Sequence, residues 1–508
     1  MSLDGALSIA TGGLANVNRQ LALVSQNVAN ANTPGYSAQI ATQYSMTADG
    51  MSLGVHSGKA IRNLDMVLQA EVFSQNATVG GLQTRQTALQ AIDAVMGTPG
   101  QGSDIASLLG QLQDQFSTLL TNPDSPPQQS AVVSAAMTLA ESINRLSDAY
   151  TTQRQAAQDN IVSEVASLNT TLSTIGSLSD KIVNLKSGGQ STADLENQRD
   201  AAIADLSQLL DIKVLAQPNG DVLLATTAGL ALPTHGPSSR LSTADVNVQP
   251  GTFYPGGGIP GISIDGIDVT RQLRGGRIGA NIALRDITLP TDQAELDEFA
   301  QNLASRFDDQ GLTLFSDPTG AVPLGTPPPV QNGYVGFAGA IQVFSGVQTT
   351  PSQVRDGTHS VVGSPVGPGA FVPNPPGGPT GFTAMIERVL HFTLGSEAQA
   401  GVPQPTSHTS GLGQTGTLAA PYAAPPTLAG IAATMLAAQA QDSTTVSTQA
   451  DTEQAVQTTL AGKLSAQSGV NMDTEMSHMI LLQNAYTANA RIIAAVQAIW
   501  AQLMQTVQ

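Results

Sequence analysis

The stretch "LVSQNVANANTPGYS", residues 23–37, ends a long run of regularly spaced apolar residues. Upstream of it, apolar residues recur at alternating steps of four and three, which is the spacing of a coiled-coil seam. This first seam consists of Leu3, Leu7, Ala10, Leu14, Val17, Leu21, Val24 and Val28. We therefore predict a helix that begins almost at the first residue and ends at the Asn-Thr-Pro-Gly sequence.

The four residues Asn32, Thr33, Pro34 and Gly35 are expected to lead the chain out of this helix into the next domain. Pro34 lacks the N–H donor that a continuing helix needs, and it drives Thr33 toward an extended conformation. Asn32 and Gly35 readily adopt turn geometries. The motif is equally compatible with a plain helix stop, and it carries no catalytic chemistry.

The last part of the chain repeats the pattern of the first. Its seam consists of Leu482, Tyr486, Asn489, Ile493, Val496, Trp500, Leu503 and Val507. Each seam covers about 38 Å of helix at 1.5 Å per residue. Either seam alone fits the buried face of an ordinary globular helix, but matched seams at both ends favour a terminal coiled coil made by residues 1–35 and 470–508.

Such an isolated pair is expected to be marginal in stability. Burying one seam contributes on the order of 10 kcal/mol, and ordering the residues that carry it costs at least as much. The flanking residues Ala6, Ala22, Ala485 and Ala490 are small and allow close neighbours. We therefore expect these helices to order fully only when copies of the chain pack side by side.

The remainder of the chain predicts a mainly α fold with a β-rich insertion, an α+β multidomain protein. Amphipathic periodicity predicts long packed helices, and short β-favouring runs around "QPNG" predict hairpins. The expected parts are a long-helix domain of residues 60–211 with about 275–310 and 427–469, a β-rich insertion of residues 212–274, and a Pro/Gly-rich segment of residues 312–425 with no assigned structure. Residues 36–59 are interpreted as a polar, mixed segment.

The composition excludes several kinds of partner. The formal net charge is −18 without any basic run, so neither nucleic acid nor an anionic membrane is an expected partner.

The absence of cysteine excludes disulfides and thiolate nucleophiles. No segment approaches the roughly 18 apolar residues of a membrane span, and Asp4 stands where a secretory signal carries positive charge, so we expect no cleaved signal peptide.

No motif points to an enzyme, a cofactor or a metal site. The glycine-rich stretches at residues 256–261 and 411–416 match the dinucleotide pattern but lack its strand–turn–helix context, so flexible loops are expected. The histidines are scattered without metal-ligand spacing and are expected at the surface: His56, His235, His359, His391, His408 and His478.

Paired acids between residues 291 and 310 raise the possibility of general acid–base chemistry. They are Asp292, Glu295, Asp297, Glu298, Asp308 and Asp309. Because the apolar residues of this segment share one helical face, the acids are expected on a solvated polar face, and no catalytic role is predicted.

Two of these stretches also resemble a known family. "SQNVANANTPGYS" and "AYTANARIIAAVQAIWAQLM" are similar to the terminal signatures of bacterial flagellar axial proteins, which form rod, hook and junction. "NPDSPPQQSAVVSAAMTLAESIN" and "DLENQRDAAIADLSQLLDI" resemble the hook-associated proteins of the hook–filament junction. Trp500 departs from the mostly aliphatic seam of that family.

The resemblance implies a secreted structural subunit without enzymatic activity, exported by the flagellar type III apparatus. It implies a ring of copies at the hook–filament junction, with hook protein and the next junction protein as partners and an export chaperone at the C-terminal helix. The alternatives are a hook or rod subunit, against which the long helical domain speaks, and an adhesin or enzyme displayed on the flagellum through residues 312–425.

Overall fold

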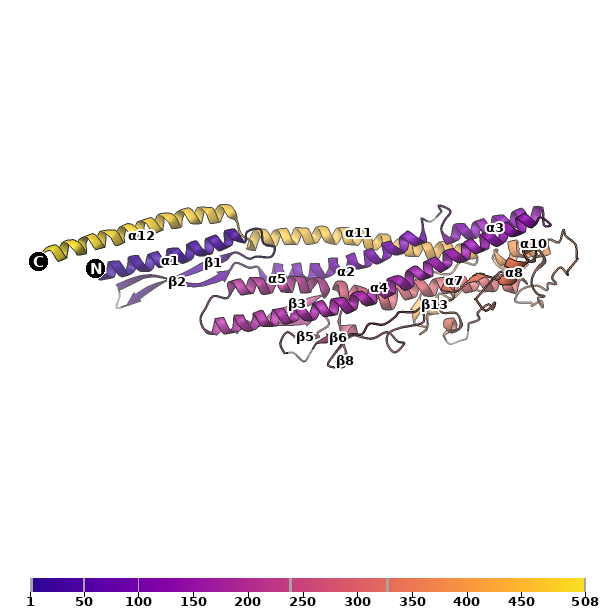
Figure 1. Cartoon of the computed structure of the whole chain (residues 1–508), viewed down its shortest axis with the longest axis horizontal. Coiled ribbons are helices and arrows are strands. Elements are labelled where there is room, and N and C mark those ends of the chain that lie inside the picture. Colours follow the sequence, from indigo (N-terminus) through magenta and orange to yellow (C-terminus); the bar gives the residue numbers. More distant parts are fainter. Residues whose placement is uncertain (1–2, 49–50, 99, 237–239, 326–328, 507–508) are drawn as a thin grey trace.

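The computed structural model describes residues 3–48, 51–98, 100–236, 240–325 and 329–506 as an elongated molecule whose long helices follow its long axis (Figure 1). The longer helices are α1 (Leu3–Ala29), α2 (Met66–Met96), α3 (Ile105–Thr121), α4 (Pro126–Ser187), α5 (Ala193–Leu209), α6 (Gly276–Ala283), α7 (Leu289–Asp309), α11 (Leu428–Ser468) and α12 (Met472–Thr506). Shorter ones are α8 (Ser345–Thr349), α9 (Gln353–Asp356) and α10 (Ala384–Arg388). The expected mainly helical fold with inserted β structure is confirmed.

The strands form small antiparallel sheets. The longest pair is β1 (Gln39–Ala48) with β2 (Met51–Arg62). Two three-stranded sheets lie in the middle of the chain: β3 (Ile212–Ala216), β4 (Val222–Thr226) and β5 (Ala231–Leu232), then β6 (Leu241–Ser242), β7 (Ser263–Ile264) and β8 (Ile267–Asp268). Later pairs are β9 (Phe315–Ser316) with β10 (Gln342–Val343), β11 (Glu397–Gln399) with β12 (Val402–Pro403), and β13 (Ser410–Leu412) with β14 (Leu418–Ala419).

Several helices begin at capping residues that the sequence places there. Asp65 accepts hydrogen bonds from the N–H groups of Val67 and Leu68 at the start of α2, and Asp104 accepts one from Ser107 at the start of α3. Such caps satisfy backbone donors that have no partner within the helix. Pro126 opens α4, where its missing N–H costs nothing.

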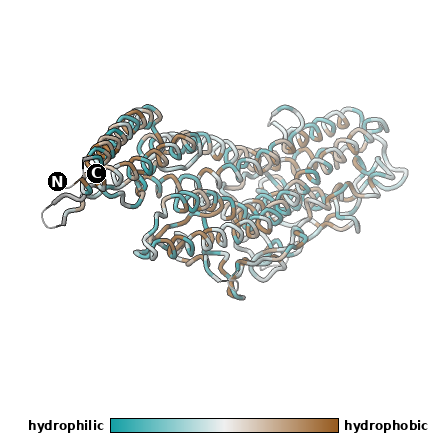
Figure 2. Tube along the Cα trace, turned by 60° about the vertical axis from the view of Figure 1, so that its left-hand side comes forward, coloured by the Kyte–Doolittle hydropathy of each residue, from teal (hydrophilic) through white to brown (hydrophobic). Residues whose placement is uncertain are grey.

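Helix α4 runs through two hydrophobic cores. Its first half, from Val132 to Ala157, packs with α3, α7 and the start of α11. Its second half, from Ile161 to Ile175, packs with α5, α6 and the sheets β3–β5 and β6–β8. The chain alternates between polar and apolar residues along these helices, as the tube coloured by hydropathy shows (Figure 2). The single helix therefore joins the two cores into one body.

The segment that the sequence leaves unassigned contributes directly to the first core. Leu314, Phe315, Phe337, Val354 and Met385 are all buried there. The ring of Phe315 meets that of Phe307 from α7 edge-on, with centroids 5.5 Å apart. The prolines and glycines between these residues form loops, but the apolar residues they separate pack on α3, α4 and α7.

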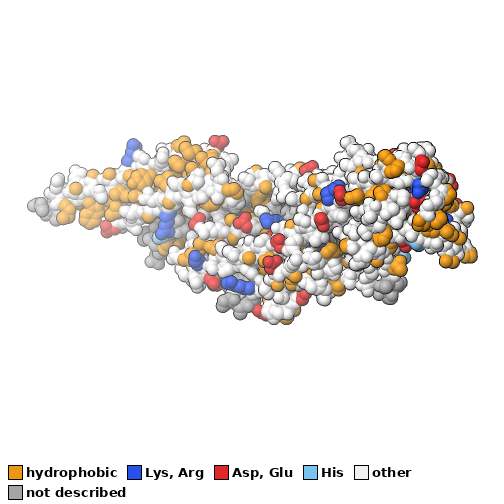
Figure 3. Space-filling model, turned by 45° about the vertical axis from the view of Figure 1, so that its right-hand side comes forward, with side chains coloured by type: hydrophobic (Ala, Val, Ile, Leu, Met, Phe, Trp, Pro, Cys, Tyr) orange, Lys and Arg blue, Asp and Glu red, His pale blue; other side chains and the backbone are white. Residues whose placement is uncertain are grey.

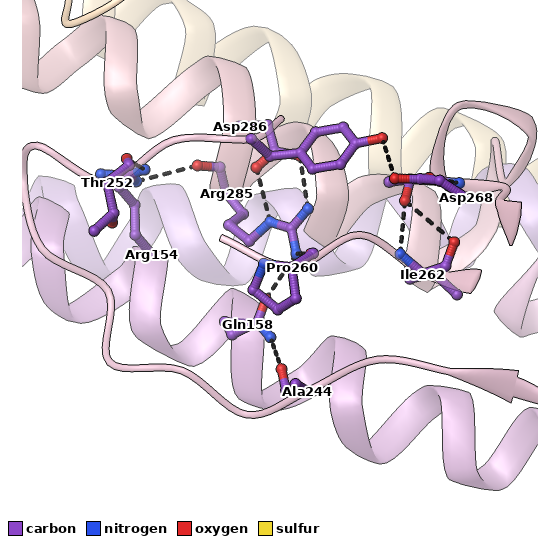
Figure 4. A network of polar contacts seen from close by, with 11 residues as sticks. Arg154, Gln158, Ala244, Thr252, Pro260, Ile262, Asp268, Arg285 and Asp286 are labelled. Carbon is purple, nitrogen blue, oxygen red and sulfur yellow. Dashed lines mark hydrogen bonds and ion pairs between the residues drawn. The ribbon is translucent and has the colours of Figure 1, made fainter. Parts of the chain in front are cut away.

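Two buried arginines tie the loop before β7 to α4, as the close view shows (Figure 4). Arg154 on α4 donates to the backbone carbonyls of Arg285, Gln249 and Thr252 at 3.1, 3.2 and 2.9 Å. Burial lowers the pKa of Arg154 to about 10. All three guanidinium nitrogens nevertheless donate to a carbonyl, two in the loop and one at Arg285, so backbone carbonyls solvate the buried charge.

Arg285 lies in a π-helical turn, residues 284–288, between α6 and α7. Its side chain is 0% exposed and donates twice to the carboxylate of Asp286, at 2.8 Å each. It also donates to Oε1 of Gln158 at 2.7 Å and to the carbonyl of Pro260 at 3.3 Å. The π turn, which is rare within helices, thus places one ion pair between α4 and the loop.

Candidate assembly interface

Helices α1 and α12 lie side by side at one end of the molecule, with both chain ends at that end (Figure 1). Two contacts fix their antiparallel register. A Cβ on Gly13 would lie 2.9 Å from Oδ1 of Asn489, and Nδ2 of Asn27 donates to Oε1 of Glu475 at 2.9 Å. Both contacts are separated by the same number of residues on each helix, so the register of the pair is constant between them.

The seam residues of α1 are all covered to some degree. Ala10, Val17 and Val24 are buried, and Leu3, Leu7, Leu14, Leu21 and Val28 are half-buried. This coverage comes from α12 on one side and from strand β2 on another. Within α1, none of the described large hydrophobic side chains is exposed.

The seam of α12 is covered less completely. Val496 is buried, and Leu482, Asn489 and Ile493 are half-buried. Tyr486, Trp500 and Leu503 are 41%, 43% and 48% exposed, and Val507 lies outside the described residues. The register places Trp500 and Leu503 at or past the level of Leu3, so this part of the seam has little of α1 to pack against. The seam assignment itself stays a prediction.

The exit motif ends α1 and turns the chain into β1. Asn32, Thr33, Pro34 and Gly35 are exposed, and Gly35 has a φ of +74°, which a glycine adopts without strain. The N–H of Tyr36 donates to the carbonyl of Thr33 at 3.2 Å, closing the turn. The chain therefore reverses here.

The reversed chain forms a hairpin that the sequence analysis did not predict. Strands β1 and β2 pack on α1, and a Cβ on Gly54 would lie 3.7 Å from Ile9 of α1. The apolar residues of the hairpin do not form one buried face, since Ile40, Tyr44, Val55 and Ile61 are exposed. This is why its sequence gives no clean alternation of apolar and polar residues.

Asn27 joins the three segments of this end of the molecule, and sequence reasoning did not single it out. Its side chain is 1% exposed. Nδ2 donates to the carbonyl of Gln39 at 3.0 Å and to Glu475, and Oδ1 accepts from the N–H of Gln39 at 3.0 Å and from the hydroxyl of Tyr36 at 3.2 Å. One amide thereby holds the end of α1, the start of β1 and the start of α12. A polar residue beside an otherwise apolar seam was the only signal in the sequence.

Replacing Asn27 by alanine is expected to loosen the hairpin, because it leaves the N–H of Gln39 and the carboxyl of Glu475 without this buried partner, at a cost of about 1–3 kcal/mol. Hydrogen exchange of the amides in β1 should become faster while that of α4 is unchanged. The matched control is Asn18→Ala at an exposed position of α1. Equal exchange rates in both variants would contradict this role.

A second group of contacts fixes the terminal end to the body. Arg62 at the end of β2 pairs with Glu196 at 2.9 Å and with Asp200 on α5. Oδ1 of Asn197 accepts from the N–H of Ser37 at 3.4 Å, and its Nδ2 donates to the carbonyl of Ser37 at 3.1 Å. The N–H of Ala38 donates to the carbonyl of Ser468 at 2.8 Å. The hairpin is therefore one link between the terminal helices and the body, beside the direct bond from Gln26 of α1 to Asp194 of α5 at 3.1 Å.

The expectation that the acids of α7 lie on a solvated face was wrong for three of the six, while Asp292 and Asp308 are half-buried and Asp309 is exposed. Glu295, Asp297 and Glu298 are buried. Asp297 accepts from the N–H groups of Gly336 and Ala338 at 2.7 and 2.9 Å, and Glu298 accepts from the hydroxyl of Tyr334 at 2.6 Å. Burial raises the pKa of Asp297 and of Glu295 to about 7. Asp297 and Glu298 thus bind the segment of residues 334–338 to α7, which is a structural role.

The other chemistry-bearing residues do not converge. The glycine-rich stretch 256–261 leads into β7, and 411–416 lies at the β13–β14 hairpin, so no helix begins at either. Of the histidines, His359 is half-buried and the rest are exposed. Within the part of the chain that the structure describes, no cluster of three or more ligand side chains could hold a metal ion, and no helix is long and apolar enough to cross a membrane.

Comparison with known families accounts for this arrangement. Residues 89–321 match the flagellar hook-associated protein FlgK helical domain. Residues 7–36 match the flagella basal body rod protein family, and residues 462–506 match the C-terminal region of the flagellar basal body rod FlgEFG proteins. The helical body of the chain is thus similar to the FlgK family of flagellar hook-associated proteins. The two rod-type matches cover α1 with its exit motif and α12, the two helices that pair in the structure.

Individual relatives carry the name flagellar hook-associated protein 1. The chain is 28% identical to that of Bacillus subtilis over 235 residues, 44% of this chain and 46% of the relative. It is 26% identical to that of Salmonella typhimurium over 258 residues, 49% and 46% of the two chains. It is 24% identical to that of Escherichia coli over 321 residues, 61% and 57%. The chain thus spans about half the length of the curated relatives it matches.

Among solved structures, the chain is similar to the flagellar hook junction protein FlgK from Burkholderia pseudomallei. The identity is 25% and the TM-score 0.41, over 50% of this chain and 45% of the other. The similarity to the FlgK family rests on the sequence matches, and it is the family that the terminal motifs and the helical segment indicated.

Proposed function

We propose that this chain is a structural subunit of the bacterial flagellum that forms a ring of copies joining hook to filament. The observation that carries the proposal is the state of α12. Several large apolar side chains of α12 stay exposed, among them Met476, Ile480 and Ile492, in a chain whose two ends match axial-protein families. Such a surface favours burial in an assembly.

The shape of the molecule supports the same role. The terminal pair and hairpin form one end and the helical body the other, and hydrophobic side chains gather over the terminal end in the space-filling view (Figure 3). In this proposal the terminal helices of many copies pack along the axis of the flagellum. The outer body then adapts a curved hook lattice to a straighter filament lattice.

The proposed partners follow from this position. They are other copies of the chain, hook protein on one side and the next junction protein on the other. Export by the flagellar type III apparatus is part of the proposal, with a chaperone that holds α12 beforehand. An exposed helix with apolar residues on more than one face is a suitable segment for such a chaperone.

We also propose a division of the chain into a terminal assembly domain, residues 1–35 with 470–508, and a long-helix domain, residues 60–211 with about 275–310 and 427–469. Residues 212–274 are the β-rich insertion. The course of α11 along α2 supports placing residues 427–469 in the long-helix domain. The contribution of residues 312–394 to the first core supports joining them to the same body.

The packing of residues 312–394 in the first core also speaks against the alternative of a displayed adhesin or enzyme. A segment that supplies Phe315, Phe337 and Met385 to the core is committed to packing. We propose a purely structural role for it, without enzymatic activity. The alternative of a hook or rod subunit has support only at the two ends, where the rod-type matches lie, while the match to a helical domain of hook-associated proteins covers residues 89–321.

The experiment is deletion of the gene in the source bacterium, with electron microscopy of the isolated flagella. We expect hooks that carry no filaments, and complementation should restore filaments with a gold-labelled tag at the hook–filament boundary. A hook or rod subunit would instead leave no hook when deleted. Normal filaments in the deletion strain would contradict the proposal and favour a displayed accessory protein.

A further inference from the structure

Residues 407–422, the strap, contain the hairpin β13–β14 and lie against α7 and the 3-10 turn of residues 330–333. The structure describes every residue of the strap, and Leu412 is the one large apolar side chain among them that is fully buried. Leu412 belongs to neither hydrophobic core, and Tyr422 packs half-buried against the first. Since apolar burial is the main force that holds a segment in place, the strap depends strongly on its polar contacts.

Polar side chains of α7 hold the first part of the strap. The N–H of His408 donates to Oε1 of Glu298 at 2.8 Å. The hydroxyl of Ser407 donates to Oδ1 of Asn302 at 3.1 Å. A segment that is fixed by a few hydrogen bonds and little apolar burial opens locally at a lower free energy than the cores do.

A cavity of about 10 Å³ lies between the strap, α7 and α11, close to the smallest volume that can hold one water molecule. Its lining includes Glu295, Glu298, His408, Tyr422 and Ile431. Glu295 is 4% exposed, and its Oε2 has no hydrogen-bond partner among the described residues. The closed strap therefore leaves this carboxyl room for one water at most, which is far from the hydration that a carboxylate has in solution.

The groups around Glu295 are mostly acidic or neutral. They come from four elements: Asp292 and Glu298 on α7, Tyr150 on α4, Gln439 and Asp442 on α11, and Tyr422 and His408 in the strap. His408 is exposed, and Arg85 of α2 pairs with Asp442 at 3.3 Å on partly exposed side chains. Ionisation of Glu295 therefore places a charge in a buried site beside further carboxyls, and both conditions disfavour that charge.

Burial raises the pKa of Glu295 from 4.5 to about 7 while the strap covers it. Once the strap lifts, the carboxyl meets water and its pKa returns toward the ordinary value. The closed state thus holds the proton more tightly than the open state. Protonation of Glu295 stabilises the closed strap at low pH, and this contribution is lost as the pH rises through about 7.

We propose that the strap is a pH-sensitive cover, which is closed on α7 while Glu295 is protonated and opens locally as this carboxyl ionises. Opening lets water reach Glu295 and uncovers Leu412, while the two hydrophobic cores keep the body folded. The inference goes beyond the proposed structural role and does not depend on it.

Asp297, whose pKa burial also raises to about 7, acts at a different place. It is not among the residues that line the cavity, and its oxygens accept from the N–H groups of Gly336 and Ala338. The amides of the strap and those of residues 336 and 338 therefore report on two different carboxyls.

Hydrogen exchange of the full-length chain between pH 5 and pH 8 tests the inference. Each exchange rate is divided by the intrinsic rate at the same pH, so that the opening equilibrium remains. The readout is the N–H of His408 and that of Ala420, which donates to the carbonyl of Thr409 at 2.8 Å. We expect opening to become roughly 10- to 100-fold more favourable at pH 8 than at pH 5. The amides of α4 should keep the same protection throughout.

Glu295→Gln separates ionisation of this carboxyl from other effects of pH, because glutamine has a similar shape and cannot ionise. In this variant the protection of the strap should no longer change with pH. Glu141→Gln, at an exposed position of α4, should behave as the wild type. Wild-type protection that stays the same at pH 5 and pH 8, or that falls equally in Glu295→Gln, would overturn the inference.

Thiol labelling gives a second readout, because the chain has no cysteine of its own. Ser407→Cys places a thiol at a position that is 9% exposed, and Thr406→Cys places one at the exposed neighbouring position. At pH 8, Ser407→Cys should react roughly 10-fold or more faster in the wild-type background than together with Glu295→Gln. Thr406→Cys should react equally in both backgrounds. Equal rates for Ser407→Cys in both backgrounds would mean that ionisation of Glu295 does not open the strap.

Discussion

Arg285→Met is expected to remove about 3–5 kcal/mol from the unfolding free energy of the helical body, the cost of breaking a buried ion pair from one side. The methionine fills a similar volume, but the carboxylate of Asp286 loses both of its bonds to the guanidinium. The side-chain oxygen of Gln158 and the carbonyl of Pro260 lose a donor as well. Denaturant unfolding followed by circular dichroism measures the effect.

Two further variants test the reason for this loss. Arg145→Met, at an exposed position of α4, should change the unfolding free energy by no more than about 0.5 kcal/mol. Adding Asp286→Asn to Arg285→Met should restore part of the stability, because it removes the unpaired charge that the first change leaves behind. If the double variant is no more stable than the single one, the loss does not come from the ion pair.

Glu295→Gln is expected to stabilise the protein at pH 8 by up to about 3 kcal/mol and to leave it nearly unchanged at pH 5. Burial raises the pKa of Glu295 from 4.5 to about 7, and the groups that oppose this shift are the hydroxyl of Tyr422 and the amide of Gln439, neither of which is charged. The neighbouring Asp292 has a pKa that burial and the Glu295 charge also raise.

The sign of this pH dependence follows from proton binding at Glu295. Since the folded state holds its proton more tightly than the unfolded state, the stabilising effect is complete below pH 4.5 and is lost as the pH rises through about 7. Glutamine cannot ionise and so avoids that loss. Thermal unfolding of the variant and the wild-type chain between pH 5 and pH 8 measures the difference in stability, with Glu141→Gln at an exposed site of α4 as control. A variant whose advantage does not grow with pH would contradict the assignment.

The elements predicted best from the sequence are those whose apolar spacing is uninterrupted. The seam ending at Val28 and the run from Ile161 to Leu185 are regular, and both lie in long helices of the structure. Asn122 and Gly188 directly follow the observed ends of α3 and α4, because local turn residues decide where a helix ends.

Other features could not be predicted because their partners lie far along the chain. The carboxyl of Asp297 accepts hydrogen bonds from the N–H groups of Gly336 and Ala338, and the hydroxyl of Tyr334 donates to Glu298. The helical period of α7 places these acids on its polar side, but it cannot show that a later segment covers that side. The hairpin β1–β2 escaped prediction because it is half-exposed on both faces, so its apolar residues show no alternation.

At the candidate interface too, the local features could be predicted from the sequence and the contacts between distant residues could not. The heptad positions and the exit motif were visible as spacing and as turn residues, whereas the role of Asn27 depends on Gln39 and Glu475 meeting around it. The register of the helix pair also required the structure. The approach of Gly13 to Asn489 sets which residues of α1 and α12 lie at the same level.

The central claim is that the terminal helices are assembly elements that the body does not bury. Limited proteolysis of the full-length chain, with the cut sites identified by mass spectrometry before and after self-association, tests it most directly. In the monomer, the first cuts should fall within residues 470–506, and they should disappear in the associated form while residues 126–187 resist in both. Resistance of α12 in the monomer, with first cuts in the body, would contradict the account.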